Sequence, residues 1–456
     1  MFSVLAFGWL ISTSIEVEAT TGSWATLPMN VQPYLSEDIF NYATVPILFG
    51  TPPQQVNLTV DLSADLLAAY AYDCVLCAGT TFFDPELSST YKALGTPWGN
   101  SLPTFNGIEV NDTIDFAGIL EVQNRNFVLI KDGSDPDISA RIYNGHLGLF
   151  LSPLSSTSVS KHILSQLHAS SSLLNPVIGM RFDSGNPKIT IGALDPNDYE
   201  GEINWVEMDT QLDPHGDYLN TFKLDGLKGY DGSFVALGGN NLTAALDSLF
   251  MSISIPNTTP YFTNPAHTGP TPQIALDPIF GLIEYECDTS PTKPYVALSA
   301  SINGVDYQID SADNLLRPQF GFSITGYCPV GIRNRTDTTT PDVVFGQPFL
   351  RSVYIAYRFP TDDCPGYYGF AFPTGSNRTE SQVSQTPTST PANSAQCLSL
   401  TTPTSTPTPF ANVVLAQDAR ASKERFGVYG RPGAGEVTLL GVDEIQKMVW
   451  NWTDLS

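Results

Sequence analysis

Two aspartates stand where acid–base chemistry could take place. Asp61 follows the run NLTV and Asp247 follows TAAL, so each ends a strand-like segment of small, mostly apolar residues. They are 247 − 61 = 186 residues apart, one in each half of the 456-residue chain. Two carboxylates brought together can share one proton, because repulsion between like charges drives their pKa values apart. Such a pair can activate water and protonate a carbonyl, which is the chemistry of peptide hydrolysis in acid.

The elements that must position these aspartates are predicted to be short β-strands. From Tyr42 onward, β-patterned runs recur at roughly ten-residue spacing between Gly, Pro, Asn and Asp breaks, which favours all-β, barrel-like lobes. One stretch, 158–174, has helical spacing. The second half repeats the plan of the first, since each contains a hydrophobic-Gly element downstream of its aspartate, at 146–149 and 344–346. This indicates an internal duplication.

The composition narrows the class of partner. The chain contains 21 Lys and Arg against 46 Asp and Glu, a net charge of −25. Nucleic acids and anionic membranes are not expected partners, because phosphate binding requires clusters of basic residues. No stretch after the N-terminus reaches ~18 uninterrupted apolar residues, so no membrane span is expected. Neither a metal nor a cofactor is predicted, since metal-ligand spacing is absent from the five histidines, His146, His162, His168, His215 and His267.

The N-terminus and the sequons predict export. Residues 1–19 resemble a signal peptide, with an apolar run at 2–11 and a small-residue cleavage site at 17–19. A secreted or vacuolar-lysosomal location is therefore expected. Seven N-x-S/T sequons fit a glycoprotein; they start at Asn57, Asn111, Asn241, Asn257, Asn334, Asn377 and Asn451.

The six cysteines suit an oxidising compartment. Cys74 and Cys77 could close a tight local loop, although a CxxC motif is also compatible with redox activity or half a zinc site. Cys287 is expected to pair with Cys328. The remaining two, Cys364 and Cys397, either pair with each other or leave Cys397 free in a tail.

Between Tyr42 and Phe372 the chain resembles the pepsin-like aspartic peptidase family. The matching segments are Val45–Gln54 with its GTPPQ turn, Phe83–Lys92, Gly145–Phe150, Lys188–Met208 and 343–359, besides the two aspartates. The resemblance implies an all-β, bilobal pepsin-like acid-protease fold, in which two β-barrel-like lobes flank a central cleft. Asp61 and Asp247 would then form the catalytic dyad, one from each lobe.

The residues after both aspartates depart from the family pattern Asp-Thr/Ser-Gly, whose hydroxyl braces the opposite loop and whose glycine amide donates to the carboxylate. In the first loop Leu62 replaces the hydroxyl residue and Ser63 replaces the glycine. In the second loop Ser248 retains the bracing hydroxyl, but Leu249 replaces the glycine and Phe250 a small polar residue. A misplacement of about 1 Å can cost on the order of 100-fold in rate.

Two further departures point the same way. Aligned instead on its SADL segment, the first loop lacks one residue. Phe105 stands at the tyrosine position of the substrate-covering hairpin, which is shortened, so no phenolic hydroxyl is expected there.

The sequence therefore predicts a family member with impaired or absent peptidase activity that binds a polypeptide substrate or a protein ligand in its cleft as a monomer. The alternative is an active aspartic endopeptidase that works at acidic pH. The expected organisation is a signal peptide (1–19), a lead-in (20–41), an N-terminal lobe (42–215), a C-terminal lobe (216–372), a Ser/Thr/Pro-rich solvated linker (373–409) and a tail (410–456).

Overall fold

The fold was analysed in a computed structural model of the chain. The structure describes residues 22–31, 43–75, 77, 81–99, 106–132, 145–151, 162–170, 172–183, 185–209, 220–238, 241–250, 252–268, 274–276, 282–286, 297–310, 327–335 and 341–403. All of them belong to one compact unit, Met1–Asn412. The signal peptide, the tail, Phe105 and Cys287 lie outside the described residues.

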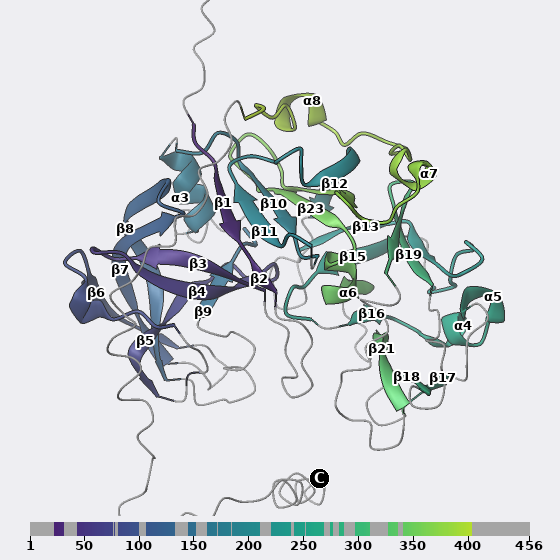
Figure 1. The fold of residues 1–456 in the computed structure, drawn as a ribbon, viewed down its shortest axis with the longest axis horizontal. Coiled ribbons are helices and arrows are strands. Elements are labelled where there is room, and N and C mark those ends of the chain that lie inside the picture. Colours follow the sequence, from purple (N-terminus) through teal and green to yellow (C-terminus); the bar gives the residue numbers. More distant parts are fainter. Residues whose placement is uncertain are drawn as a thin grey trace, which may run out of the picture. The chain divides into compact units, whose positions relative to one another are not determined.

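Strands dominate the described part of the chain and form three sheets (Figure 1). The largest contains, in spatial order, β1 (Ala25–Pro28), β11 (Lys188–Ile191), β10 (Val177–Arg181), β23 (Tyr354–Arg358), β24 (Tyr367–Pro373), β12 (Tyr199–Asp209), β13 (Thr221–Leu224), β15 (Leu242–Leu246), β22 (Val343–Phe345), β16 (Ile253–Ile255), β21 (Tyr327–Asn334), β18 (Leu282–Glu286) and β17 (Ile274–Leu276). The second contains β2 (Asn30–Val31), β3 (Ala43–Phe49), β4 (Gln54–Asp61), β9 (Gly145–Gly148), β5 (Leu67–Val75), β8 (Leu120–Asp132), β7 (Asn106–Phe116) and β6 (Lys92–Gly99). The third consists of β14 (Gly226–Lys228), β19 (Leu298–Ile302) and β20 (Val305–Ile309).

Helices in the described residues are short: α3 (Ile163–Ala169), α4 (Thr259–Phe262), α5 (Pro265–Thr268), α6 (Gln347–Leu350), α7 (Glu380–Val383) and α8 (Ser394–Cys397), with a 3₁₀ turn at Pro85–Leu87. The predicted helix within 158–174 is α3, which is shorter than the pattern suggested. No helix among these described segments is long and apolar enough to cross a membrane.

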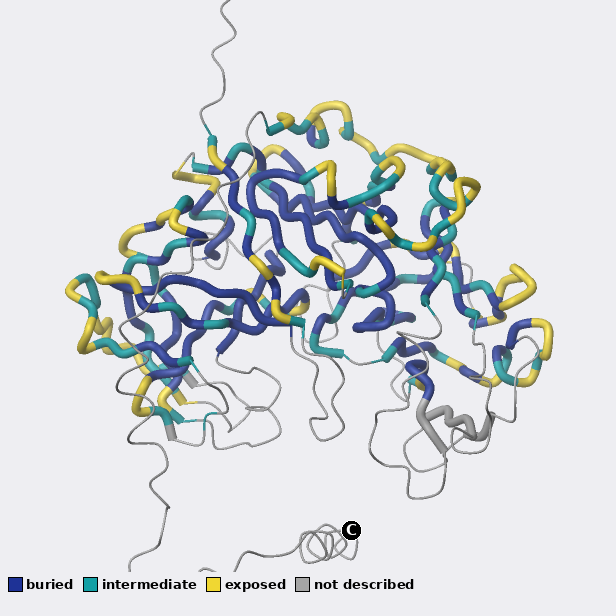
Figure 2. Tube along the Cα trace, in the orientation of Figure 1, coloured by how far each residue is buried: buried dark blue, intermediate teal, exposed yellow. Residues whose placement is uncertain are grey.

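The predicted all-β, bilobal fold is confirmed. In the first lobe, a pairing of β3 with β7 closes the ring β3-β4-β9-β5-β8-β7 into a barrel. The strands β10, β23 and β24, which join the lobes, are buried along their whole length (Figure 2). Their sequences, VIGMR, YIAYR and YYGFAFP, are rich in the β-branched and aromatic residues that pack well on a pleated sheet covered on both faces.

The internal duplication is visible in the strands that hold the aspartates. In the first half, β9 lies between β4 and β5 and runs parallel to β4, so that Asp61 is opposite Gly148. In the second half, β22 lies between β15 and β16 in the same way, with Leu246 opposite Phe345. The two hydrophobic-Gly elements therefore occupy equivalent positions beside the two aspartates.

The lead-in is part of the sheet rather than a separate segment. Strand β1 pairs with β11 along its whole length, with Ala25 opposite Ile191. Both residues are fully buried. The lead-in thus supplies an edge strand to the sheet that joins the lobes.

The segment from 374 to 403, here called the strap, differs from the predicted solvated linker because it is held against the body of the protein. At its middle, the amide and hydroxyl groups of Thr388 and Ser389 bond to the backbone and side chain of Asn303. A side chain at Gly304 would collide with Thr388, so the turn after β19 is shaped to receive the strap.

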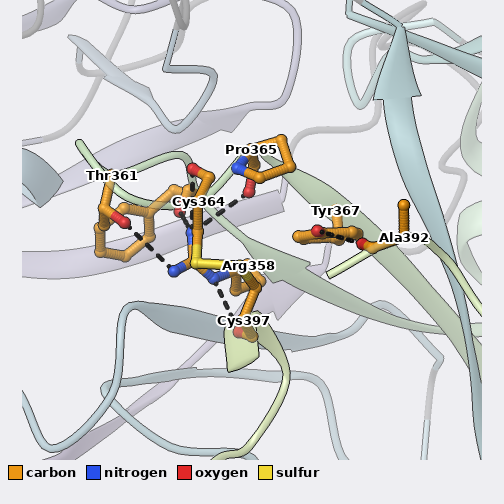
Figure 3. Close-up of a disulfide and its surroundings, with 8 residues drawn as sticks. Arg358, Thr361, Cys364, Pro365, Tyr367, Ala392 and Cys397 are labelled. Carbon is orange, nitrogen blue, oxygen red and sulfur yellow. Dashed lines mark hydrogen bonds between the residues drawn. A yellow bond between two sulfur atoms is a disulfide. The ribbon is translucent and has the colours of Figure 1, made fainter. Parts of the chain in front are cut away.

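A disulfide fixes the strap farther along. Cys364 is bonded to Cys397, which resolves the open alternative, and both cysteines are buried (Figure 3). The buried Arg358 donates to the carbonyl of Cys397, and Tyr367 donates to the carbonyl of Ala392. Because the strap satisfies these buried groups of β23 and β24, it forms part of the folded unit.

The end of the strap reaches a segment of the first half of the chain. The side chain of Asn175, which precedes β10, accepts from the amide of Thr401 at 2.7 Å and donates to its carbonyl at 2.8 Å. Cys74 and Cys77 form a disulfide at the end of β5, which was one of the alternatives for this CxxC motif. The predicted partner of Cys328 lies outside the described residues.

Candidate active site

The backbone of β9 holds Asp61 at the end of β4. The amide of Leu149 donates to the carbonyl of Asp61 at 2.8 Å, and the amide of Gly148 donates to the carbonyl of Leu66 at 2.8 Å. These bonds clamp both ends of the loop after Asp61. Asp61 itself is only 2 % exposed.

Both carboxylate oxygens of Asp61 have partners from its own lobe. The amide and the hydroxyl of Ser63 each donate to Oδ1 at 2.6 Å. On the other side, Nε2 of His146 lies 2.9 Å from Oδ2. Burial by itself raises the pKa of Asp61, but the charge of His146 and the hydrogen bonds from His146 and Ser63 outweigh it and lower the pKa below the ordinary value.

Asp247 is also held by the backbone of its own half. Its amide donates to the carbonyl of Phe345 at 3.0 Å, and its Oδ1 accepts from the amide of Leu249 at 2.9 Å. The side chain is half-buried. The amide two residues after each aspartate therefore donates to its carboxylate, although neither of these residues is a glycine.

Ser248 joins the two aspartate loops across the lobes. Its Oγ accepts from the amide of Leu62 at 3.1 Å and donates to the carbonyl of Val60 at 2.7 Å. These are the contacts of a loop brace. Leu62, whose side chain is buried, has no hydroxyl with which to return the contact, so the brace runs in one direction only.

A second bracket, which sequence reasoning missed, supports the first loop from the C-terminal lobe. The side-chain amide of Asn220 donates to the carbonyl of Leu62, and the hydroxyl of Tyr368 donates to the Oδ1 of Asn220. Burial raises the pKa of Tyr368 well above its ordinary value, so the hydroxyl keeps the proton that it donates. Both side chains are buried. No local sequence signal marks this pair, because its members are 148 residues apart.

Leu249 extends from the second loop to an apolar cluster of the first lobe. The cluster consists of Ala68, Tyr70, Phe82, Val128 and Ile130, and Leu249 packs against it together with Trp98. The next residue, Phe250, lies under the guanidinium of Arg333, 4.0 Å from the ring centroid. Two apolar side chains thus stand where the family pattern has a glycine and a small polar residue.

Phe105 lies outside the described residues, although the strands that flank it, β6 and β7, pair up to Gly99 and Asn106. The other residue that sequence reasoning missed is His146, which belongs to the hydrophobic-Gly element 146–149. Its chemical type, a histidine among Leu and Gly, was the signal that could have identified it. In the described segments no group of three or more His, Cys, Asp or Glu could hold a metal ion.

A second histidine near this site predicts a pH-dependent stability. His162 caps α3 by accepting from the amide of Leu164, and burial lowers its pKa to about 4, although the backbone of Gly148 and Phe150 acts in the opposite direction. The unfolded chain binds this proton below about pH 6.5 and the folded chain only below about 4. Stability from this group is therefore complete above pH 6.5, declines between 6.5 and 4, and changes no further below 4.

Over that range we expect a loss of about 3 kcal/mol from His162. Urea unfolding at pH 7 and pH 4 measures it when wild type is compared with His162→Asn, which keeps a capping acceptor but does not titrate. The variant should lose less stability between the two pH values. An identical loss in both proteins would contradict the prediction.

Comparisons with known proteins place this geometry in context. A family model described as eukaryotic aspartyl protease matches residues 41–364. Among curated proteins, syncephapepsin of Syncephalastrum racemosum is 24% identical over 75% of this chain and 80% of its own length. Chymosin of Callithrix jacchus is 25% identical over 68% and 76%, and cathepsin E-B of Xenopus laevis is 25% identical over 71% and 79%.

Proposed function

Because the chain belongs to the eukaryotic aspartyl protease family, we propose that it is an exported, polypeptide-binding member whose peptidase activity is impaired or absent. The observation that carries this proposal is the position of Leu249 against the apolar cluster of the first lobe. A peptidase of this family needs a backbone surface without a side chain beside Asp247. Leu249 supplies a branched side chain there, and overpacking of this kind moves neighbouring groups rather than leaving them in place.

The state of Asp61 supports the same proposal. Its Oδ1 is engaged by two donors of Ser63, where a glycine would supply one. In a proton-sharing pair, one carboxylate is ionised and the other protonated, and both face the same water molecule. The second donor of Ser63 ties Oδ1 of Asp61 to its own loop instead.

An active acid endopeptidase remains the second candidate, and specific contacts favour it. Ser248 braces the first loop, and each carboxylate accepts the amide two residues further on, as the family pattern requires. The dyad Asp61 and Asp247 would then act on a water molecule between them, with one carboxylate as base and the other as acid.

The proposal of export rests on the predicted signal peptide and on two disulfides. Glycosylation would be compatible with the exposed Asn241, Asn257 and Asn377, whereas Asn111 is buried and its amide donates to Asn126. A secreted or vacuolar-lysosomal location and a monomeric state are part of this proposal.

The two candidates are separated by measuring cleavage. Purified protein at pH 3–6 should cleave a denatured protein no faster than its Asp61→Asn variant, and at least about 100-fold more slowly than Callithrix jacchus chymosin under the same conditions. It should still bind an immobilised statine-type peptide. Leu249→Gly combined with Phe250→Thr should raise cleavage above the wild-type level. Wild-type cleavage that a statine inhibitor blocks and Asp61→Asn abolishes would instead establish the active enzyme.

A further inference from the structure

The two halves of the site differ in one residue on the strand next to each aspartate, at the position opposite the residue that precedes the aspartate by two. In the first half, His146 stands opposite Thr59, two residues before Asp61. In the second half, Val344 occupies the equivalent position, opposite Ala245 and two residues before Asp247. The duplication therefore supplies an internal reference: one aspartate has an imidazole beneath it and the other an apolar side chain.

The register explains why the imidazole reaches the carboxylate. Residues directly opposite each other on paired strands project to the same face, and residues two apart on one strand share that face. His146 and Asp61 thus emerge on one side of the sheet, and Nε2 comes within 2.9 Å of Oδ2. His146 is 7 % exposed, and its Nε2 makes no hydrogen bond to another group among the described residues.

We propose that His146 is a positioning residue that withdraws Asp61 from the dyad by directing its carboxylate into its own lobe. Oδ2 then faces Nε2 of His146 and Oδ1 accepts from Ser63, so both oxygens of the carboxylate are engaged within the first lobe. This inference rests on the proposed function and gives it a cause separate from Leu249.

The described residues of β5 and of the start of α3 that lie beside β9 contribute one titratable side chain, His162. On β5, the residues opposite β9 are Leu67, Ala68 and Ala69, none of which titrates. At α3, His162 approaches the backbone of Gly148 and Phe150 and is neutral above about pH 4.

Two carboxylates come from the adjacent loops, Asp65 from the loop after Asp61 and Asp247 from the facing lobe. Burial has the largest influence on the pKa of Asp61 and raises it, but the charge of His146 and the hydrogen bonds from His146 and Ser63 together lower the pKa below its ordinary value.

The direct test is a titration of Asp61 in the full chain. Aspartates labelled with ¹³C at the carboxyl carbon are followed by NMR, and the Asp61 signal is assigned by its loss in Asp61→Asn. In wild type, Asp61 should stay ionised below its ordinary midpoint near pH 3.9. In His146→Val, which copies the second half, the midpoint should rise by about 1 unit or more, a tenfold change in proton affinity, because burial then acts without an opposing charge.

A conservative variant separates charge from packing. His146→Gln keeps an N–H donor but carries no charge, so its midpoint should lie between those of wild type and His146→Val, and it keeps the test available where the valine variant fails to fold. His168→Gln, in the last turn of α3, is the matched control and should leave the Asp61 midpoint unchanged. A lower melting temperature with an unchanged Asp61 midpoint in both His146 variants would overturn the proposal.

Cleavage assays distinguish this inference from the proposed function. In the Leu249→Gly, Phe250→Thr background, adding His146→Val should raise kcat/KM at least tenfold and should change its pH profile. Equal cleavage with and without His146 would contradict the inference and leave the proposed function intact. Cleavage by the wild-type protein would contradict the proposed function. The role of His146 would then still be decided independently, by the titration of Asp61.

Discussion

Replacing Gly148 by alanine is expected to destabilise the protein by at least about 3 kcal/mol and to displace the Asp61 loop. A Cβ atom at this position would lie 2.5 Å from the amide nitrogen of Leu66 and 2.6 Å from the carbonyl oxygen of Ala64. Both neighbours are backbone atoms, so no flexible side chain can move aside. The backbone of the loop itself must shift, and the bond from Gly148 to Leu66 would be lost with it.

The duplication provides a replicate of this experiment. Gly346 is the second-half counterpart, and its Cβ would meet the carbonyl oxygens of Phe250 and Ser252. Gly346→Ala should therefore cost a similar amount and disturb Asp247 instead of Asp61. Gly185→Ala, whose nearest atom is the side-chain oxygen of Asp183 at 3.1 Å, is the matched control. Urea denaturation of the three variants measures the loss of stability. Equal midpoints for Gly148→Ala and Gly185→Ala would contradict the predicted clash between a side chain at residue 148 and the backbone of the Asp61 loop.

Removing the side chain of Asn220 is expected to cost about 3–4 kcal/mol, since it leaves two buried groups without a partner. The carbonyl of Leu62 loses a donor and the hydroxyl of Tyr368 loses its acceptor. Tyr368→Phe leaves only the Asn220 oxygen unsatisfied, so it should cost about 1–2 kcal/mol.

A double-mutant cycle tests this bracket. Because the two side chains share one hydrogen bond, Asn220→Ala with Tyr368→Phe should cost less than the sum of the single changes. Tyr307→Phe, which removes a buried hydroxyl that donates to the carbonyl of Phe370, is the control. The free-energy costs of Tyr307→Phe and Asn220→Ala should be additive. If the costs of Asn220→Ala and Tyr368→Phe are additive as well, the two side chains are not coupled and the prediction is wrong.

Much of the fold could be predicted because it depends on patterns that repeat along the chain. Strand periodicity, turn residues and the duplicated hydrophobic-Gly elements are local patterns, and each can be recognised within a short segment of the sequence. The one-directional brace of Ser248 could also be anticipated, because Leu62 visibly lacks a hydroxyl.

The long-range contacts that hold Asp61 and its loop could not be predicted from local patterns. Asn220 meets Leu62 across 158 residues, and the contact depends on the distance between lobes rather than on a local pattern. His146 was visible as a residue, but its contact with Asp61 requires the pairing register of β9 with β4. The attachment of the strap could not be predicted, because low hydrophobicity indicates only solvation, whereas its polar groups bond to side chains such as Asn303 and Asn175.

Because of the strap, a recombinant fragment of this protein must extend beyond the segment that resembles the family. The matched family segment ends at residue 364, which would leave Cys364 as a free thiol and would omit β24, a strand from the middle of the largest sheet. A fragment that ends after β24, where the family resemblance stops, would lack the strap. Arg358 would then lose the carbonyl of Cys397 to which it donates, and Gly304 would lose its contact with Thr388. Domain boundaries taken from sequence similarity therefore cut through a compact unit that includes the strap up to residue 403.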